Sequence, residues 1–350
     1  MLSNRTKHLL IFLSGCVSTC VFLYAFFESS SPTVRDTFSL PCSEVMRSVS
    51  HVMSSEWVKE LKRYLAASTS RQVSVVLANA RYEEVVVNWL AAAAHARPPL
   101  QDVIVVALDR ELHSFLLSKE INVVYLPIVS MIDMSYKFPK SFSSIMMLRL
   151  GVMRIINHLG YHVAMYDADA IVLRNPQPLF DAHPDADIIS SSGEFPQFLL
   201  EQWNVNSTLC IGAVLVKSNE RTEQYWETMA SIHLMVPWQN TNDQYRLNFA
   251  LQSLGIRWGV DDDVQVGICQ NGLKVAVLPN SLACRGIKNC HPEEGRAQYY
   301  IWHAGFRTEE GKVDGAKRGN AWFLRERWKD VERHLVGYEW LLKIVSWRPR

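Results

Sequence analysis

The sequence has little excess charge of either sign. Its 36 lysine and arginine residues and 35 aspartate and glutamate residues give a formal net charge of +1 over 350 residues. A protein that binds nucleic acid through phosphate contacts needs a basic excess, so no nucleic-acid partner is expected. The 16 glycines and 14 prolines are too few for a collagen-like or linker protein. Hydrophobic residues make up 48% of the chain, which suffices for a large core and excludes a disordered protein.

Several signatures of common binding sites are also missing. No G-x-G-x-x-G follows the first predicted strand and no G-x-x-x-x-G-K-[ST] occurs, which disfavours a dinucleotide-binding fold and a P-loop. No C-x-x-C pair or cluster of histidine and cysteine indicates structural zinc. The chemistry must therefore be sought in other residue types, above all in carboxylates.

Residues 9–27 read as a membrane span, because they contain no aspartate, glutamate, lysine or arginine. A helix of this length spans roughly 28 Å, close to the hydrocarbon thickness of a bilayer. Arg5 and Lys7 precede the run, so the N-terminus is expected in the cytosol and the rest in a lumen. A cleaved signal peptide is the alternative, but its apolar core would be shorter and Ala25-Phe26-Phe27 is a poor cleavage site. The predicted parts are a cytosolic tail (1–7), a transmembrane signal anchor (8–27), a lumenal stem (28–70) and a folded lumenal domain (71–340).

Five cysteines follow the predicted anchor, an odd number. They are Cys42, Cys210, Cys269, Cys284 and Cys290. At least one is therefore free or pairs with a second copy of the chain, which would make a homodimer. One bridge is predicted among the last three, which lie close in sequence. Asn206, in Asn206-Ser207-Thr208, is a candidate acceptor for glycosylation in a lumen.

Short β-branched runs alternate with helical patterns along the domain. The predicted strands are 73–79, 102–109, 121–127, a strand over 162–173 that is broken by a turn, and later strands over 187–192, 211–218 and 275–279. The predicted helices are 82–96, 111–119, 143–158 and an amphipathic helix over 329–347. This alternation is typical of an α/β fold, a parallel or mixed sheet with helices on both faces. Ligands of such sheets bind at the carboxyl ends of the strands.

One such strand end carries a pair of carboxylates, Asp167 and Asp169. Residues i and i+2 of an extended chain point the same way, so both carboxylates are expected to converge on one hard cation such as Mg²⁺ or Mn²⁺. Two other sets compete with this pair. Asp185 and Asp187 look like a loop before the next strand, whereas Asp261–Asp263 follows a strand-like run and stays a real alternative. For each of these sets, the alternative to a metal site is a surface turn that carries two acidic residues by chance.

The stretch HLGYHVAMYDADAIVLRNP resembles the central signature of the nucleotide-diphospho-sugar transferases, in the form of glycosyltransferase family 77. Four further segments resemble that family in the same order over residues 71–325: VVLANARYEEVVVNWL, TLCIGAVLVKSNE, NTNDQYRLNFAL and WHAGFRTEEGKVDGAKRGNAWFL. Two departures leave the donor sugar open. Cys210-Ile211 stands where the family has Asn-Thr, and Ala304-Gly305 follows the histidine where the family has a polar residue. Neither departure removes the carboxylate pair.

The resemblance implies a GT-A fold with a Rossmann-type mixed sheet. It also implies a Golgi type II membrane enzyme that moves a single sugar from UDP-galactose or UDP-xylose to a glycan or glycoprotein, with retention of configuration. The domain at 71–340 would then be catalytic. Asp167, Asp169 and His303 would hold Mn²⁺ (or Mg²⁺). A catalytically inactive relative that binds glycans in the lumen is the alternative function, and a metal-dependent hydrolase of nucleotide sugars is a third.

The same resemblance assigns roles around the donor. Lys312, or in its place Lys317 or Arg318, would offset charge on the departing diphosphate. The donor itself would be contacted by Asn79, Asp109, Arg149, Asp167 and Gly212, with Arg154 as a further candidate for the phosphate. Asp243 and Gln244 would face the sugar or acceptor as catalytic residues. Each of these residues also has a structural alternative. Asn79 and Asp109 would cap helices, and Asp243 would lie at a polar helix N-terminus. His303 would pack beside Trp302, and the lysines and arginines would be solvated side chains.

Overall fold

The computed structural model describes residues 55–345, apart from 127–139, 194–199, 202, 204, 206, 236–242, 287–289, 291–298, 304, 306–307 and 331–334. The predicted tail, the signal anchor, most of the predicted stem, Cys42, Asn206 and Ala304 lie outside the described residues. Among the helices within these ranges, none is both long enough and apolar enough to span a bilayer.

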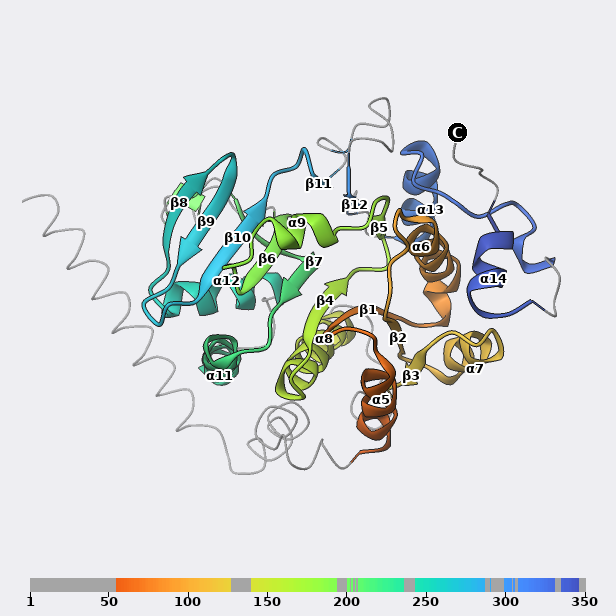
Figure 1. Cartoon of the computed structure of the whole chain (residues 1–350), viewed down its shortest axis with the longest axis horizontal. Helices are drawn as coiled ribbons and strands as arrows, with labels where there is room; N and C mark the ends of the chain where they lie inside the picture. The colour runs from red at the N-terminus through yellow and green to blue at the C-terminus, as the bar shows by residue number, and fades with distance from the viewer. Residues whose placement is uncertain are drawn as a thin grey trace, which may run out of the picture. The chain divides into compact units, whose positions relative to one another are not determined.

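A nine-stranded sheet forms the centre of the fold (Figure 1). In spatial order its strands are β3 (Val123–Tyr125), β2 (Val103–Ala107), β1 (Gln72–Ala78), β4 (His162–Tyr166), β7 (Thr208–Val216), β6 (Ile188–Gly193), β10 (Lys274–Leu278), β9 (Val264–Ile268) and β8 (Arg257–Asp261). The four strands from β3 to β4 are parallel, whereas β7 is antiparallel to both of its neighbours. The predicted mixed α/β sheet is thus confirmed.

Strand β1 shows why the predicted strands read as continuous apolar runs. Successive side chains of a strand point to opposite faces. Val73 and Val75 accordingly lie in one hydrophobic core, and Val76 and Ala78 lie in the other. A strand with a core on each face needs apolar side chains at almost every position, so its sequence does not alternate.

Helices cover both faces of this sheet (Figure 1). The core that holds Val76 is closed mainly by α6, whereas α5, α8, α11 and α12 close the core that holds Val75. The helices are α5 (Glu56–Ala67), α6 (Glu83–His95), α7 (Arg110–Ser118), α8 (Lys140–His158), α9 (Gln177–Asp181), α11 (Glu220–Met235), α12 (Asp243–Ser253), α13 (Glu309–Arg318) and α14 (Gly337–Lys343), with 3-10 turns η1 (Ala80–Tyr82) and η2 (Trp328–Asp330).

A second, three-stranded sheet brings a late segment of the chain to the carboxyl end of β4. Its order is β11 (Ala283–Arg285), β12 (Ile301–His303) and β5 (Ala170–Val172). Strand β12 is parallel to β11 and antiparallel to β5. Since β5 follows β4 after a short turn, this pairing places His303 beside the chain that carries Asp167 and Asp169.

Two segments differ from the sequence-based expectation. Helix α5 lies within the range assigned to the stem, yet its residues Val58, Leu61 and Leu65 are buried in the core under β1, so the packed part of the chain extends into that range. The single helix predicted over 329–347 is wrong. Val336 is extended (φ −136°, ψ 168°), and α14 begins only at Gly337, whose φ is +54°. A β-branched residue followed by a glycine with positive φ interrupts the helix there.

Candidate metal centre

Three side chains from two distant segments meet at the carboxyl end of β4. Asp167 follows β4 directly, Asp169 precedes β5, and His303 is the last residue of β12, paired with Ala170. One ligand atom from each of the three side chains lies within 4.8 Å of the other two. The structure therefore brings together the three residues that the sequence analysis predicts to hold a cation.

The two carboxylates converge for a different reason from the one expected. The stretch between them is a turn rather than extended chain, closed by a 2.9 Å hydrogen bond from the Ala170 amide to the Asp167 carbonyl. The Asp167 amide in turn donates to the Gly212 carbonyl on β7, at 2.8 Å. The neighbouring strand therefore holds the first carboxylate in place.

His303 is neutral at physiological pH. Its Nε2 lies 3.6 Å from Asp167 Oδ2 and 3.8 Å from Asp169 Oδ1, and the residue is 3% exposed. Burial lowers the pKa of His303 to about 3; Asp169 opposes this shift, and Arg285, Lys312 and Arg149 add to it. Its Nδ1 is buried and has no hydrogen-bond partner among the described residues. Two carboxylates and a neutral imidazole are a donor set that suits Mn²⁺, so these residues fit the implied metal.

Asp169 is paired with Lys312, on α13. The Lys312 Nζ lies 2.5 Å from Asp169 Oδ2, and Asp169 is 6% exposed. Burial acts to raise the pKa of Asp169, but Lys312 and His303 more than offset it, so its pKa lies below the usual range. Three basic residues were predicted to offset the charge of the diphosphate. Lys312 lies beside the candidate metal ligands, whereas Lys317 and Arg318 are exposed. Lys317 lies instead over the Trp322 ring.

Arg149 links the metal centre to the predicted catalytic pair. Its guanidinium forms ion pairs with Asp167 and with Asp243, the first residue of α12. Arg149 Nε also donates to Asp243 Oδ2 at 2.9 Å. Arg149 and Asp243 are both almost fully buried. Arg149 thus holds two of the predicted site carboxylates in place, and its predicted contact with the donor stays a prediction. The other arginine considered, Arg154, pairs with Glu223 of α11 and lies away from this group.

Gly212 allows the close approach of β7 to the imidazole. A Cβ at this position would collide with His303 Cε1 and Nδ1 and would lie 3.1 Å from Asp167 Oδ2. A similar contact occurs next to Gln244, where a Cβ at Gly193 would lie 2.7 Å from Gln244 Nε2. Glycine is therefore required at Gly212 by the His303 ring, and at Gly193 by the backbone carbonyl of Leu209, whose oxygen would lie 2.7 Å from the same Cβ.

Asn79 and Asp109, two strand-end residues predicted to contact the donor, differ in what their side chains bind. Asp109 caps α7, since its Oδ1 accepts from the Leu112 amide at 2.9 Å and its Oδ2 accepts from the Ala80 amide at 2.7 Å. The structural alternative is therefore observed for Asp109. Asn79 makes no side-chain cap, and its Oδ1 is buried without a hydrogen-bond partner in the described part of the chain.

The competing acidic sets do not form a metal site. Asp261–Asp263 is the exposed turn of the β8–β9 hairpin, in which Asp262 and Asp263 adopt φ values of +44° and +66°. Asp187 is buried at the start of β6 and accepts hydrogen bonds from Asn219, Arg221 and the Lys274 amide. Within the residues that the structure describes, no second group of three histidine, cysteine or acidic side chains lies as close together.

Asp187→Asn is expected to lower the free energy of unfolding by about 2 kcal/mol at pH 7, because a buried carboxylate loses charged hydrogen bonds to a half-exposed arginine. Burial acts to raise the pKa of Asp187, but hydrogen bonds from Arg221, the Lys274 amide and Asn219 hold it below its usual range. A lowered pKa contributes stability above the unfolded value of about 4, and this contribution is lost as the pH falls through the folded pKa. Denaturant unfolding from pH 7 to pH 3 should therefore show the two proteins converging. The exposed Asp185→Asn is the matched control, with a change below about 0.5 kcal/mol.

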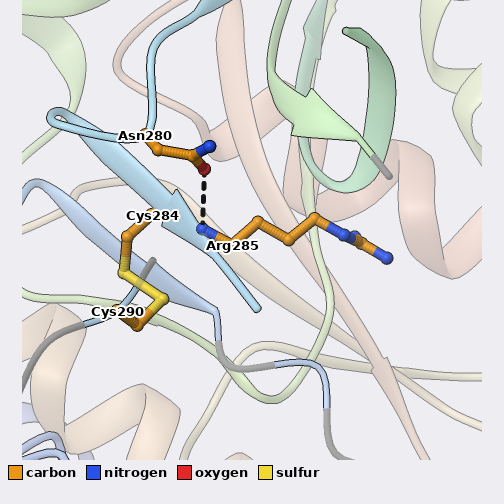
Figure 2. Close-up of a disulfide and its surroundings, with 4 residues drawn as sticks. All are labelled: Asn280, Cys284, Arg285 and Cys290. Atoms are coloured by element: carbon orange, nitrogen blue, oxygen red, sulfur yellow. Dashed lines mark hydrogen bonds between the residues drawn. A yellow bond between two sulfur atoms is a disulfide. The ribbon is translucent and has the colours of Figure 1, made fainter. Parts of the chain in front are cut away.

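One charged residue of the site was missed by the sequence analysis. Arg285, at the end of β11, contacts the Cys210 sulfur on β7. Its neighbour Cys284 forms a disulfide with Cys290 (Figure 2), which confirms the bridge predicted among the last three cysteines. Cys210 and Cys269 are buried and free. The only sequence signal for Arg285 was its place next to a predicted disulfide.

One comparison with known proteins confirms the earlier resemblance at the level of the nucleotide-diphospho-sugar transferase family. The family model described as nucleotide-diphospho-sugar transferase matches residues 99–315. A comparison with curated protein sequences finds no match. Among solved structures, the apo bifunctional glycosyltransferase WbbM is similar at 12% identity and a TM-score of 0.46, over 72% of this chain and 50% of that one. The galactosyltransferase LgtC with donor and acceptor sugar analogues is similar at 10% identity and a TM-score of 0.41, over 73% of this chain and 98% of that one. Mouse xyloside xylosyltransferase 1 in its apo form is similar at 13% identity and a TM-score of 0.39, over 67% of this chain and 97% of that one.

Proposed function

The chain belongs to the nucleotide-diphospho-sugar transferase family, and from this premise we propose that it moves a single sugar from a nucleotide-diphosphate donor to a hydroxyl of a glycan or glycoprotein. The observation that supports this proposal is the meeting of Asp167, Asp169 and His303 at the carboxyl end of β4. In α/β sheets this edge is where ligands bind.

Asp167, Asp169 and His303 would hold Mn²⁺ or Mg²⁺ in this proposal. When bound, such an ion stabilises the negative charge that develops on the leaving diphosphate. The neutral state of His303 matters here, because only an unprotonated imidazole nitrogen can be a metal ligand. Lys312, already directed at Asp169, would neutralise further charge on the same diphosphate.

Asp243 is held by neighbouring groups on both of its oxygens. Its Oδ2 accepts from Arg149, and its Oδ1 accepts from the Gln244 amide at 2.9 Å. We assign Asp243 a positioning role and Gln244 the contact with the sugar or acceptor. The bond between the anomeric carbon and the phosphate oxygen would break, and the acceptor oxygen would bond to that carbon on the face from which the phosphate leaves, which retains configuration. The proton of the acceptor hydroxyl would pass to the leaving phosphate oxygen. This step needs no strong protein base.

UDP-galactose or UDP-xylose is the proposed donor, and the proposed location is the Golgi membrane, with the anchor at 8–27 and the catalytic domain in the lumen. One observation favours a second candidate, an inactive glycan-binding relative. Cys210 is fully buried on β7, at a position where the family has a polar residue.

A donor screen tests the proposed function directly. In the presence of Mn²⁺, the full chain is expected to be stabilised by its own nucleotide sugar and by the matching nucleoside diphosphate. A ligand that binds only the folded state contributes about 2.7 kcal/mol at a hundredfold excess over Kd. Thermal unfolding with a panel of nucleotide sugars measures this, and EDTA should remove the shift.

The products then separate the candidate functions. A transferase releases nucleoside diphosphate much faster when an acceptor is added, and the sugar appears on the acceptor. A hydrolase releases free sugar without acceptor. If no nucleotide or nucleotide sugar raises the unfolding temperature with Mn²⁺, the transferase proposal is wrong and the glycan-binding relative is favoured.

A further inference from the structure

Strand β8 forms one edge of the nine-stranded sheet (Figure 1). A two-residue turn joins it to β9, and both turn residues, Asp262 and Asp263, have positive φ, as in the type I′ turns that close tight hairpins. Four of the five residues of β8 are exposed, and Val260 is 66% exposed. This end of the sheet therefore presents a strand to solvent.

The opposite edge of the sheet is protected. Strand β3 at that edge has only three residues, and the Tyr125 amide donates to Glu60 Oε2 of α5 at 3.4 Å. Strand β8 has five residues, contains neither lysine nor proline, and pairs with β9 without a bulge. Short length, lysine, proline, bulges and covering helices are the features that keep edge strands from pairing. Strand β8 lacks the protection that β3 has.

The hairpin determines which backbone groups of β8 point outward. Asp261 and Val264 flank the two-residue turn, so they exchange both hydrogen bonds of a closely spaced pair. Hydrogen-bonded and non-hydrogen-bonded pairs alternate along an antiparallel ladder. The amides and carbonyls of Trp258 and Val260 therefore point away from β9, and a further strand would bond to these two residues.

The sequence of β8 is complementary to itself about Gly259. In an antiparallel pair of two copies with the two-fold axis at this residue, Trp258 of one copy lies opposite Val260 of the other, so the outward backbone groups of both bond to each other. Arg257 of each copy then lies opposite Asp261 of the other, which sets opposite charges across the pair. An axis at Trp258 aligns no opposite charges, and an axis at Val260 aligns Arg257 only with the turn.

The side chains of β8 fit this arrangement on both faces. Trp258 packs against β9, since a Cβ at Gly267 would lie 2.8 Å from its ring, and Val260 projects to the same face of the strand. Across the axis the exposed Val260 of one copy would cover the Trp258 of the other, and pairs of an aromatic and a β-branched residue stabilise neighbouring strands. Arg257 and Asp261 project to the other face and are both exposed.

We propose that this protein forms a two-fold homodimer in which the β8 strands of two copies pair antiparallel about Gly259 and join the two sheets into one. The occupant of this edge is thus a second copy of the chain, selected by the match of Arg257 with Asp261 across the axis. The pairing needs no cysteine and does not depend on the proposed function.

Sedimentation of the full chain in detergent, over about 1 to 200 µM, measures this dimer. One short strand from each copy makes a small interface, so a dissociation constant in the micromolar range is expected. Arg257→Glu sets like charges opposite each other at both ends of the pair and should weaken the dimer by about tenfold or more. Asp261→Lys should have the same effect.

The two substitutions together provide the decisive control. The double variant Arg257→Glu with Asp261→Lys again sets opposite charges across the axis, so its dissociation constant should return to within about threefold of wild type. Lys62→Glu changes the charge by the same amount as Arg257→Glu at an exposed position on α5, and it should leave the dimer unchanged.

Cysteine cross-linking tests the position of the axis. Gly259→Cys sets two thiols opposite each other with Cα atoms about 4.5 Å apart, which a disulfide can span. The substitution is compatible with the single copy, because a Cβ at Gly259 would come no closer than 4.0 Å to Val266 Cγ2. In Val260→Cys the two thiols are diagonal, about 7–8 Å apart, which is too far. With a mild oxidant, non-reducing electrophoresis should show covalent dimer above the wild-type level for Gly259→Cys alone.

Each result either supports or overturns the proposal. A wild type that stays monomeric at the highest concentration overturns it, and so does a dimer that Arg257→Glu leaves intact or that the double charge swap fails to recover. Equal cross-linking of Gly259→Cys and Val260→Cys would also contradict the pairing about Gly259. None of these measurements involves a nucleotide or sugar, so their failure leaves the proposed function untouched.

Discussion

Asp169→Ala is expected to abolish sugar transfer while the chain still folds. In the proposed metal centre Asp169 would supply one of three oxygen or nitrogen ligands, and its side chain is buried there. A bound metal supplies several kcal/mol of charge stabilisation to a leaving diphosphate, so its loss should lower kcat/KM by at least about a thousandfold. Transfer assays over a range of Mn²⁺ concentrations measure this. Mn²⁺-linked stabilisation by nucleoside diphosphate should disappear in the same variant.

The chain offers a matched control for this substitution. Asp185 belongs to a second Asp-x-Asp pair, is exposed and pairs loosely with Lys274 at 3.3 Å. Asp185→Ala should therefore leave kcat/KM and the response to Mn²⁺ unchanged. An Asp169→Ala enzyme that retains full activity would contradict the assignment of the metal centre, whatever the control shows.

Arg149→Met should unfold far more easily than wild type and should also lose activity. The substitution leaves Asp243 buried without its cation and frees Asp167 at the metal centre. Removing one partner of a buried ion pair costs about 3–5 kcal/mol, because the remaining charge is not solvated. Chemical denaturation at pH 7 measures the change in the free energy of unfolding.

Two further variants test the reason for that loss. Arg154→Met lies on the same helix but removes a partly exposed pair with Glu223, so it should cost only about 1 kcal/mol. Adding Asp243→Leu to Arg149→Met removes the stranded charge and should recover part of the stability but none of the activity. If the double variant is no more stable than Arg149→Met, the unpaired charge of Asp243 is not the cause.

The strands and helices of the sheet could be predicted closely from local patterns. The strand expected at 73–79 is β1 (Gln72–Ala78), and the helix expected at 82–96 contains α6 (Glu83–His95). Most residues of both elements are buried in the hydrophobic cores. Any α/β fold needs apolar residues at such positions, so the local pattern alone reveals the element. The helix expected at 329–347 was wrong because hydrophobic spacing alone did not weigh Val336 and Gly337, which break it.

The acidic pairs mark the limit of local reasoning. Three stretches of the chain carry closely spaced aspartates, and their sequences alone left the choice open. In the structure, one pair meets an imidazole, another set is a hairpin turn, and Asp187 of the third is locked by Arg221. The difference lies in what each pair faces across the fold.

The sequence by itself determined the chemistry available to this protein: carboxylates at the end of a buried strand, a histidine late in the chain, and a run of segments typical of one enzyme family. The tertiary structure decided which of these groups act together. Strand β12 pairs with β5 and carries His303 to Asp169, and β11 brings Arg285 to Cys210. These contacts depend on the pairing of strands that are far apart in the sequence. Whether two such strands pair is decided by the hydrogen bonding and burial of the whole fold, so no local sequence pattern encodes it.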